Sequence, residues 1–425
     1  MIFMTTITKK EGNAMPFTEM LQSISALLHL LIGLCYAYQL VYLFLPLFRK
    51  ENIPVSDCKR RYAILIAARN EEVVLPHLLS SIRDQDYPAD KLCVFVVADN
   101  CTDRTAVVAE EGGAVVFCRS SQTHIGKGYA LRYLLEKIDE LEGFDSFDGF
   151  LVFDADNLLQ HDFIKCIDRL AAEGYDVFCG CRNSKNFGTN WVSSGHGLWY
   201  LHESAHLNRS RMLLGNPCMV TGTGFGFTRA LLRQMGGWNF FTLTEDVEFS
   251  TWCILHGIRS GYCHEAVFYD EQPQKFSQSW RQRTRWVQGG IQVSLRYGGQ
   301  LFKKLLCGGG YSCLEALTLQ LWGYGAGILC SLLSLLTSIL TGNLFTFLLT
   351  TLVYSIAVPV LIGIMTLLSQ WHQIPATTGK KLLSLVSFPL HVLSYIPIAL
   401  TALFRKFSWP PIEHTAALSC KDLSQ

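Results

Sequence analysis

The chain has 425 residues, of which 49% are hydrophobic and 17% are charged. The charged fraction lies below the roughly 25% of an ordinary soluble domain, so part of the chain is expected in a membrane. With 36 Lys and Arg against 35 Asp and Glu, the formal net charge of +1 gives no electrostatic basis for binding nucleic acid. The fifteen cysteines lack the C-x-x-C spacing typical of zinc sites, and we expect them to be reduced thiols in a domain that faces the cytosol.

The first expected membrane segment covers residues 20–48, which contain no formal charge. Roughly 20 residues of helix cross a bilayer, so this segment is long enough to span it, and it is too long for a signal-peptide core. Five cations follow the segment by residue 61, whereas Lys9 and Lys10 precede it. The positive-inside rule therefore predicts a retained anchor after an N-terminal tail (residues 1–19), with the next domain in the cytoplasm.

The stretch that follows, residues 58–295, carries most of the charges and alternates strand-like with helix-like runs. Apolar runs rich in β-branched residues predict strands, and runs with helical periodicity predict helices. The strands are expected at residues 62–68, 92–98, 114–117 and 150–153, and the helices at residues 71–83, 103–111 and 127–141. This βαβαβαβ order predicts an α/β domain with a mostly parallel sheet, which binds its ligands at the carboxyl ends of the strands.

Polar residues follow three of the predicted strands. Asn70 and Glu71 come after the first strand, and Asp99 follows the second. Each of these positions is also typical of a helix-capping turn, which is the simpler interpretation for any one of them alone. The fourth strand leads into Asp154 and Asp156, whose carboxylates suit Mg²⁺ or Mn²⁺ when a diphosphate completes the coordination shell. A solvated turn is the alternative at that position.

Two more acidic residues open a helical run further along the chain. Glu245 and Asp246 follow Thr244 and precede an apolar pattern of helical period. One interpretation is the acidic first turn of a helix that Thr244 caps. The other is a general base, because an attacking hydroxyl must lose its proton and a positioned carboxylate can accept it.

A third motif combines polar, cationic and aromatic side chains. Gln282, Arg285 and Trp286 have the i, i+3, i+4 spacing that places side chains on one face of a helix. The same residues are typical of an interfacial helix whose Arg and Trp lie among lipid headgroups. Lys127, between two glycines, is either a phosphate contact or an ordinary surface lysine.

Two to three further membrane helices are expected within residues 311–404. Residues 316–379 carry no charge, and a turn signal at residues 341–343 divides them into two spans. Residues 382–404 are a third candidate, but cations lie on both sides of them, so a full crossing would violate the positive-inside rule. Two prolines inside this third segment favour a kinked and shallower path. Residues 405–425 are expected to be a C-terminal tail.

In order and spacing, the motifs from Asn70 to Trp286 resemble those of the membrane-integrated family 2 glycosyltransferases. The resemblance covers about residues 62–290, and residues 220–229 also look like the acceptor-side strand and loop of that family. The family includes cellulose, hyaluronan, chitin and poly-N-acetylglucosamine synthases, and enzymes that place a sugar on a lipid. The resemblance implies a GT-A fold, with a Rossmann-like mixed sheet, next to an α-helical transmembrane region.

The resemblance also implies a role for each candidate residue. Asp246 would be the base, Arg285 would stabilise the departing diphosphate together with Gln282, and Trp286 would stack on the acceptor sugar. The full set comprises nucleotide contacts from Asn70, Glu71, Asp99, Lys127 and Asp154, metal contacts to Mg²⁺ or Mn²⁺ from Asp154 and Asp156, and catalytic contributions from Glu245, Asp246, Gln282, Arg285 and Trp286.

Three functions follow from these expectations. The first is an inverting enzyme of the cell membrane that transfers a sugar from a UDP-sugar to a growing β-linked polysaccharide. The second is a glycolipid synthase that transfers one or two sugars to a membrane lipid such as diacylglycerol. The third, from another class, is a membrane scaffold that binds a sugar nucleotide without turnover. The complete set of carboxylates favours an enzyme.

Overall fold

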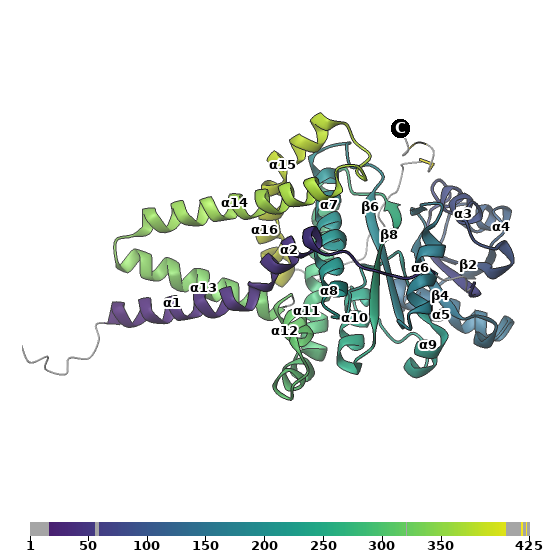
Figure 1. Cartoon of the computed structure of the whole chain (residues 1–425), viewed down its shortest axis with the longest axis horizontal. Helices are drawn as coiled ribbons and strands as arrows, with labels where there is room; N and C mark the ends of the chain where they lie inside the picture. Colours follow the sequence, from purple (N-terminus) through teal and green to yellow (C-terminus); the bar gives the residue numbers. More distant parts are fainter. Residues whose placement is uncertain (1–16, 56–58, 320, 405–417, 420–421, 423–425) are drawn as a thin grey trace, which may run out of the picture.

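The structure is a computed structural model and describes residues 17–55, 59–319, 321–404, 418–419 and 422 (Figure 1). It consists of an α/β domain and of helices that project from one end of that domain (Figure 1). The predicted tails, residues 1–19 and 405–425, lie mostly outside the described residues.

One half of the sheet, which we call the parallel half, has the predicted order. Its strands are β1 (Tyr62–Ala68), β2 (Leu92–Asp99), β3 (Val115–Arg119) and β4 (Gly149–Asp154), arranged β3-β2-β1-β4 and all parallel. The helices between them are α3 (Leu75–Arg83), α4 (Thr105–Glu111) and α5 (Lys127–Leu141). Helices cover both faces, so the central strands are apolar runs that are buried throughout.

The other half of the sheet, the mixed half, continues beyond β4. Its strands are β5 (Leu158–Leu159), β6 (Val177–Ser184), β7 (Phe225–Thr228) and β8 (Ser260–Asp270). β7 runs antiparallel between β4 and β6, β8 runs parallel to β6, and β5 is antiparallel to β8 at the sheet edge. The sequence patterns assigned neither β6 nor β8, so the sheet contains more antiparallel pairing than the strand order alone predicted.

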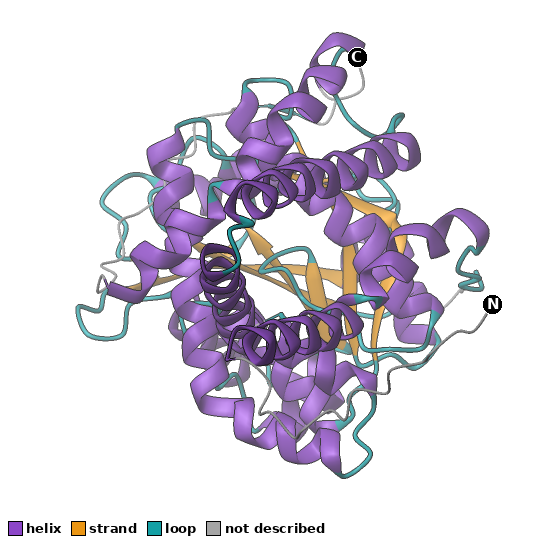
Figure 2. Ribbon diagram, turned by 90° about the vertical axis from the view of Figure 1, so that its left-hand side faces the viewer, coloured by secondary structure: helices purple, strands orange, loops and turns teal. Residues whose placement is uncertain are grey.

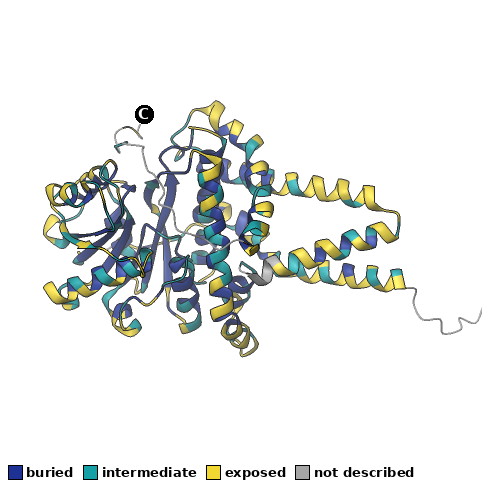
Figure 3. Ribbon diagram, turned by 180° about the vertical axis from the view of Figure 1, so that it is seen from behind, coloured by how far each residue is buried: buried dark blue, intermediate teal, exposed yellow. Residues whose placement is uncertain are grey.

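An apolar core covers each face of the sheet. On one face, α5 and α10 (Glu245–His256) enclose a cluster of aromatic rings, in which Phe150 stacks on Phe227 at 5.6 Å and Trp238 packs against Phe249 at 5.2 Å. On the other face, α3 and α6 (Phe163–Ala172) pack against the same strands. Figure 3 shows the strands as the most continuously buried part of the molecule. This packing holds the strand ends, and the polar residues on them, in fixed positions.

A continuous helical segment crosses the mixed half of the domain. It comprises α7 (Trp191–His202), the π-helical turn η3 (Glu203–Asn208) and α8 (Arg209–Leu213). Asn190 begins it with a capping box, because its side chain accepts hydrogen bonds from the backbone N–H groups of Val192 and Ser193. The remaining elements of the domain are η1 (Ala89–Lys91), η2 (Phe144–Ser146), α9 (Arg229–Met235), α11 (Phe276–Leu306) and α12 (Tyr311–Thr318).

Most of the apolar helices project from the domain or lie along it. They are α1 (Phe17–Tyr36), α2 (Tyr38–Phe48), α13 (Leu321–Leu340), α14 (Leu344–Gln370), α15 (Thr378–Leu393) and α16 (Tyr395–Phe404). By length and composition, three segments of the described chain could cross a membrane, namely Phe17–Phe48, Leu344–Gln370 and Thr378–Phe404. α1, α13 and α14 extend together away from the domain, with largely exposed surfaces (Figures 1 and 3). Seen along these helices, the sheet lies behind a layer of helices (Figure 2).

Two of the predicted membrane segments are interrupted. The first is divided between α1 and α2, and the last is divided at Ser394 between α15 and α16. α15 packs against α7 and α14, whereas α16 packs against α11 of the α/β domain. This course agrees with the kinked path that the prolines of residues 382–404 favoured. The number of helices that cross a membrane stays a prediction.

Candidate active site

A cleft with a volume of about 410 Å³ opens at the carboxyl ends of β1, β2 and β4. Its other walls come from the first turns of α5 and α10, from α7 and from α11. Every candidate residue except Asn70 lines this cleft: Glu71, Asp99, Lys127, Asp154, Asp156, Glu245, Asp246, Gln282, Arg285 and Trp286. The strand-end rule therefore located the cleft from the sequence.

Asn70 lies beside the cleft and shapes one of its loops. Its backbone has a positive φ of 59°, which Asn tolerates better than most residues. Its carboxamide oxygen accepts a hydrogen bond of 2.8 Å from the backbone N–H of Thr102. Asn70 thus joins the loops after β1 and β2, and its contact with a nucleotide stays a prediction.

Asp99 and Lys127 are both held by ion pairs inside the cleft. Arg119 donates to the Asp99 carboxylate, and both side chains are about nine-tenths buried. Lys127 pairs with Asp154, and its Nζ also donates to the backbone oxygen of Gly222 at 2.7 Å. The surface-lysine interpretation of Lys127 is therefore wrong, because the side chain is 14% exposed and bonded within the cleft.

The two carboxylates after β4 have different surroundings. The Asp154 side chain is 38% exposed to the cleft, and its backbone N–H donates to Thr223 Oγ1 at 2.9 Å. Asp156 is buried, and its Oδ2 accepts from the backbone N–H of Glu271 at 2.8 Å. Both side chains offer hard oxygen ligands to one cleft, so the pair fits Mg²⁺ or Mn²⁺ by the chemistry of its donors.

Glu245 and Asp246 form the acidic first turn of α10 at the floor of the cleft. Burial raises the pKa of Asp246, and Arg285 and Lys127 oppose that shift. Burial also raises the pKa of Glu245, with a further contribution from the charge of Asp246. Buried carboxyls with raised pKa values are suited to accept a proton near neutral pH.

The predicted capping role of Thr244 is wrong. Its side chain makes no capping hydrogen bond, and its Oγ1 is buried without a partner among the described residues. The reason is the close approach of α11, because a Cβ added to Gly289 would lie 2.3 Å from Thr244 Oγ1. Thr244 therefore serves the packing of α11 against the start of α10.

The motif on α11 points its three candidate side chains into the cleft. Arg285 Nη1 donates to the backbone oxygen of Leu243 at 3.3 Å, next to the start of α10. The Trp286 ring packs edge-on against Tyr200 of α7, with centroids 6.0 Å apart. Gln282 Oε1 is buried without a hydrogen-bond partner in the described part of the chain. An interfacial helix would not require all three side chains to face a cleft.

The mixed half supplies further cleft residues that the sequence patterns did not identify. Arg182 at the end of β6 donates from Nε to Asp270 Oδ2 at 2.9 Å, and its guanidinium lies 3.6 Å from the centre of the Tyr200 ring. Burial raises the pKa of Asp270 to about 6, although Arg182 opposes the shift. Asp270 ends β8 as Asp154 ends β4, so the strand-end rule would have found it if β8 had been assigned. Glu203, at the start of η3, also lines the cleft.

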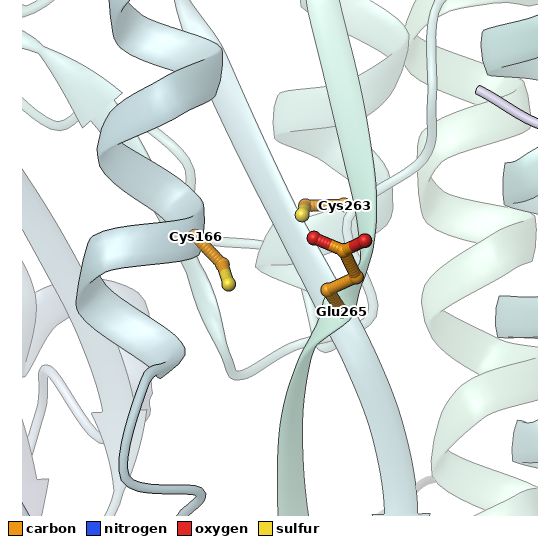
Figure 4. A group of neighbouring side chains, drawn as sticks. All are labelled: Cys166, Cys263 and Glu265. Carbon is orange, nitrogen blue, oxygen red and sulfur yellow. The ribbon is translucent and has the colours of Figure 1, made fainter. Parts of the chain in front are cut away.

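A second group of metal-ligating side chains lies outside the cleft. Cys166 of α6 meets Cys263 and Glu265 of β8, with donor atoms within 4.8 Å of one another (Figure 4). Arg169 already bonds the Glu265 carboxylate at 2.5 Å. Thiols are poor ligands for Mg²⁺ or Mn²⁺, so this group does not compete with the aspartates for such an ion. The described cysteines are free thiols, as the composition predicted.

Taken together, charged side chains of both signs converge in the cleft. Two aspartates and a lysine lie at the end of β4 and the start of α5, and a buried carboxylate with a raised pKa lies at the start of α10. An arginine lies next to that carboxylate, and an aromatic ring forms one wall.

A family model described as glycosyltransferase like family 2 matches residues 60–289, more than half of the chain. The chain is 28% identical over 240 residues to a β-monoglucosyldiacylglycerol synthase of Synechocystis, covering 55% of this chain and 48% of that protein. It is 24% identical over 276 residues to a poly-β-1,6-N-acetyl-D-glucosamine synthase of Staphylococcus aureus, covering 63% of each. The chain thus spans less than two thirds of the length of these curated relatives.

Among solved structures, the fold is similar to that of a mannosyltransferase from Pyrobaculum calidifontis in complex with GDP-Man and Mn²⁺. The TM-score is 0.58 at 18% sequence identity, and the match covers 90% of this chain and 99% of that one. At this identity the similarity concerns the fold, and it confirms the predicted GT-A architecture.

Proposed function

The chain belongs to glycosyltransferase family 2, and from this membership we propose that it is an inverting enzyme that transfers a sugar from a UDP-sugar to a growing β-linked glycan at the membrane. The observation that carries the proposal is the convergence of Asp154, Asp156, Asp246, Arg285 and Trp286 in one cleft. The polymer is supported by the similarity to the poly-β-1,6-N-acetyl-D-glucosamine synthase.

Asp246 is the proposed base. The oxygen of an acceptor hydroxyl attacks the anomeric carbon, the bond from that carbon to the diphosphate oxygen breaks, and the hydroxyl proton passes to the Asp246 carboxylate. Its place at the cleft floor and its raised pKa support this role. One base and one displacement give inversion, so an α-linked UDP-sugar yields a β-linkage. Glu245 lies beside it, and the charge of Asp246 helps to raise the pKa of Glu245.

The leaving diphosphate is the proposed ligand of Lys127, Arg285 and the β4 carboxylates. Lys127 and Arg285 carry the positive charge that stabilises the departing group, and Gln282 offers its carboxamide beside them. Asp154 and Asp156 are the residues that would hold Mg²⁺ or Mn²⁺, and such an ion neutralises charge on the diphosphate when it is bound. The Mn²⁺ of the Pyrobaculum enzyme supports a divalent ion here. Asp99, Glu71 and Asn70 lie toward the nucleotide end.

A second candidate function is glycolipid synthesis. It is favoured by the similarity to the β-monoglucosyldiacylglycerol synthase and by α16, which packs along α11 next to the cleft motif. A lipid acceptor needs such closeness to an apolar environment, since its tails must stay in hydrocarbon while its hydroxyl reaches Asp246. The non-catalytic scaffold accounts for neither the raised pKa values nor the complete motif set.

We propose that the chain is a multi-pass membrane protein. Its catalytic domain then faces the cytoplasm, as the cations after residue 48 predicted. Cys118 and Cys307 are exposed in the domain, whereas Cys218 is buried, so the first two are the useful probes. A membrane-impermeant thiol reagent should not label them in intact cells and should label them after permeabilisation. Efficient labelling of Cys118 in intact cells would reverse the orientation.

Purified full-length protein in nanodiscs, incubated with one UDP-sugar at a time, tests the function. We expect UDP release with one donor and a β-linked product by NMR. Product that resists lipid extraction and has high molecular mass supports the polymer. Product that partitions wholly into organic solvent as a one- or two-sugar species assigns the chain to glycolipid synthesis, and an α-linkage contradicts inversion by Asp246.

A further inference from the structure

Glu203 is a carboxylate of the cleft for which the proposed reaction has so far provided no role. It begins the π-helical turn η3, directly after α7, and its side chain lines the cleft. The residue is partly exposed, and within the described part of the chain its carboxylate takes part in no hydrogen bond or ion pair. π-Helical turns are rare and occur frequently at functional sites.

The two arginines near Glu203 are bonded to other groups. Arg182 is bound to Asp270 through Nε and Nη2, and its Nη1 donates to a backbone oxygen. Arg211 donates to Glu315 at 2.8 and 2.6 Å from Nε and Nη2. Their charges lower the pKa of Glu203, but burial outweighs them and raises it. The charge of Asp246 also raises it, and neither arginine bonds the Glu203 carboxylate directly.

The position of Glu203 is on the acceptor side of the cleft. Tyr200 and Trp199, within one turn before it, also line the cleft, and the Tyr200 ring packs against Trp286. η3 is attached to the membrane-proximal helix α2, because the His206 ring is hydrogen-bonded to the backbone oxygen of Leu43 at 2.8 Å. The nucleotide end, by contrast, is built by β2 and α5 of the parallel half.

We propose that Glu203 binds the acceptor, by accepting a hydrogen bond from a hydroxyl that neighbours the attacking one, and so selects which hydroxyl faces Asp246. The proposal rests on the proposed glycosyl transfer. A carboxylate accepts hydrogen bonds from hydroxyls, and aromatic rings pack against the apolar face of a sugar, so Glu203 with Trp286 suits a sugar ring.

This assignment restricts the class of acceptor. A sugar at the end of a glycan or of a glycosylated lipid has a second hydroxyl next to the one that attacks. Diacylglycerol has one hydroxyl, and that group must face Asp246, which leaves none for Glu203. The acceptor is therefore a polyol, and the preferred acceptor of this enzyme ends in a sugar.

The test uses full-length enzyme in nanodiscs with the donor that the wild type hydrolyses. The acceptors are the methyl β-glycoside of the donor sugar, its monodeoxy derivatives, and dioleoylglycerol in the same bilayer. Glu203→Gln should raise the KM for the glycoside about tenfold or more, the loss expected for one hydrogen bond to a charged group, while donor KM and UDP release to water stay within twofold. The KM of Glu203→Asp for the glycoside should lie between those of the wild type and Glu203→Gln. Glu265→Gln, outside the cleft, should have the wild-type KM.

The deoxy acceptors make the test independent of the variant's folding. With the wild-type enzyme, one monodeoxy derivative should have an acceptor KM that is raised by the same factor as in Glu203→Gln. With Glu203→Gln, removal of that hydroxyl should raise the acceptor KM no further. Additive losses, an unchanged acceptor KM in the variant, or dioleoylglycerol as the better wild-type acceptor would each overturn the assignment. Equal loss of UDP release and transfer would place Glu203 in the chemical step instead. Absence of UDP release by the wild type with every donor contradicts the proposed function itself.

Discussion

The parallel and mixed halves of the sheet differ in how the polar groups of the cleft are satisfied. In the parallel half, the two aspartates at the ends of β2 and β4 are paired, Asp99 with Arg119 and Asp154 with Lys127, although Arg69 Nε after β1 is buried without a partner in the described part of the chain. On the side of the mixed half, Arg182 and Asp270 are also paired, but Gln282 Oε1 is buried without a hydrogen-bond partner among the described residues, and the partly exposed Glu203 carboxylate forms no ion pair there. A buried group without a partner costs about 1–3 kcal/mol, so such groups persist where a ligand supplies the missing bond. Under the proposed function, this difference corresponds to a donor side that is largely preformed and an acceptor side that the substrate completes.

The largest effect is expected from Asp246→Asn, which keeps the shape of the proposed base and removes its charge. We expect the rate of UDP release to fall by about 10²- to 10⁴-fold, the usual contribution of a general base. Release is measured in nanodiscs, and thermal unfolding checks the fold. Asp145→Asn, on an exposed carboxylate outside the cleft, is the control. A rate within threefold of the wild type would remove Asp246 from the chemistry.

Removal of the divalent ion should have the next largest effect, because the paired carboxylates of the parallel half need it to hold a diphosphate. EDTA should abolish UDP release, and Mg²⁺ or Mn²⁺ should restore it. Asp156→Asn should lower the rate about 100-fold with the fold intact. Cys166→Ser, in the thiol group outside the cleft, should leave metal dependence unchanged. UDP release at the wild-type rate by Asp156→Asn would contradict the assignment of the metal site to the carboxylates after β4. A loss of metal dependence in Cys166→Ser would contradict it as well.

The two halves were also unequal in what the sequence could predict. β1 and α5 agree with their predicted ranges to the residue, because long apolar or amphipathic runs encode local structure. α3 and α4 begin later than predicted, at Leu75 and Thr105, because the acidic residues before them form turns. The backbone N–H of Glu71 donates to Thr105 Oγ1 at 2.8 Å, and Asp103 caps the same threonine.

Most of the mixed half escaped prediction for physical reasons, although the family resemblance placed a strand within residues 220–229, where β7 lies. β7 has four residues, and β6 pairs with β8 across an irregularity near Cys179 and Cys181, so neither strand has a clean alternating pattern. Arg182 and Asp270 come together only through that pairing. Glu203 has no motif around it, and its approach to the cleft depends on the π-helical turn. The one signal in the sequence that could have identified Glu203 as a cleft residue was its acidic side chain within an otherwise apolar helical run.

The pH dependence of the reaction gives a further test of the acceptor side. Burial raises the pKa values of Asp246 and Glu245 above their usual values, so each carboxyl binds its proton at a higher pH than a free carboxyl would. The proton-accepting form is therefore lost as the pH falls through the raised value. We expect kcat/KM to fall up to tenfold per pH unit on the acid side, beginning at a higher pH than an exposed aspartate would give. A flat profile down to pH 4.5 in a buffer that keeps the enzyme folded would exclude a buried carboxylate as the base.

The smallest expected effects separate the two halves most directly, because they act on binding of one substrate each. Trp286→Ala removes an aromatic wall of the acceptor side and should raise the acceptor KM about tenfold, with donor KM within twofold. Asp99→Asn removes a charge at the nucleotide end and should do the reverse, raising donor KM by about the same factor. Trp286→Phe, which keeps an aromatic face, should recover most of the loss. If Trp286→Ala instead raised donor KM, or if both variants affected both substrates equally, the cleft would be one undivided site, and the contrast between paired and unpaired polar groups would reflect packing alone.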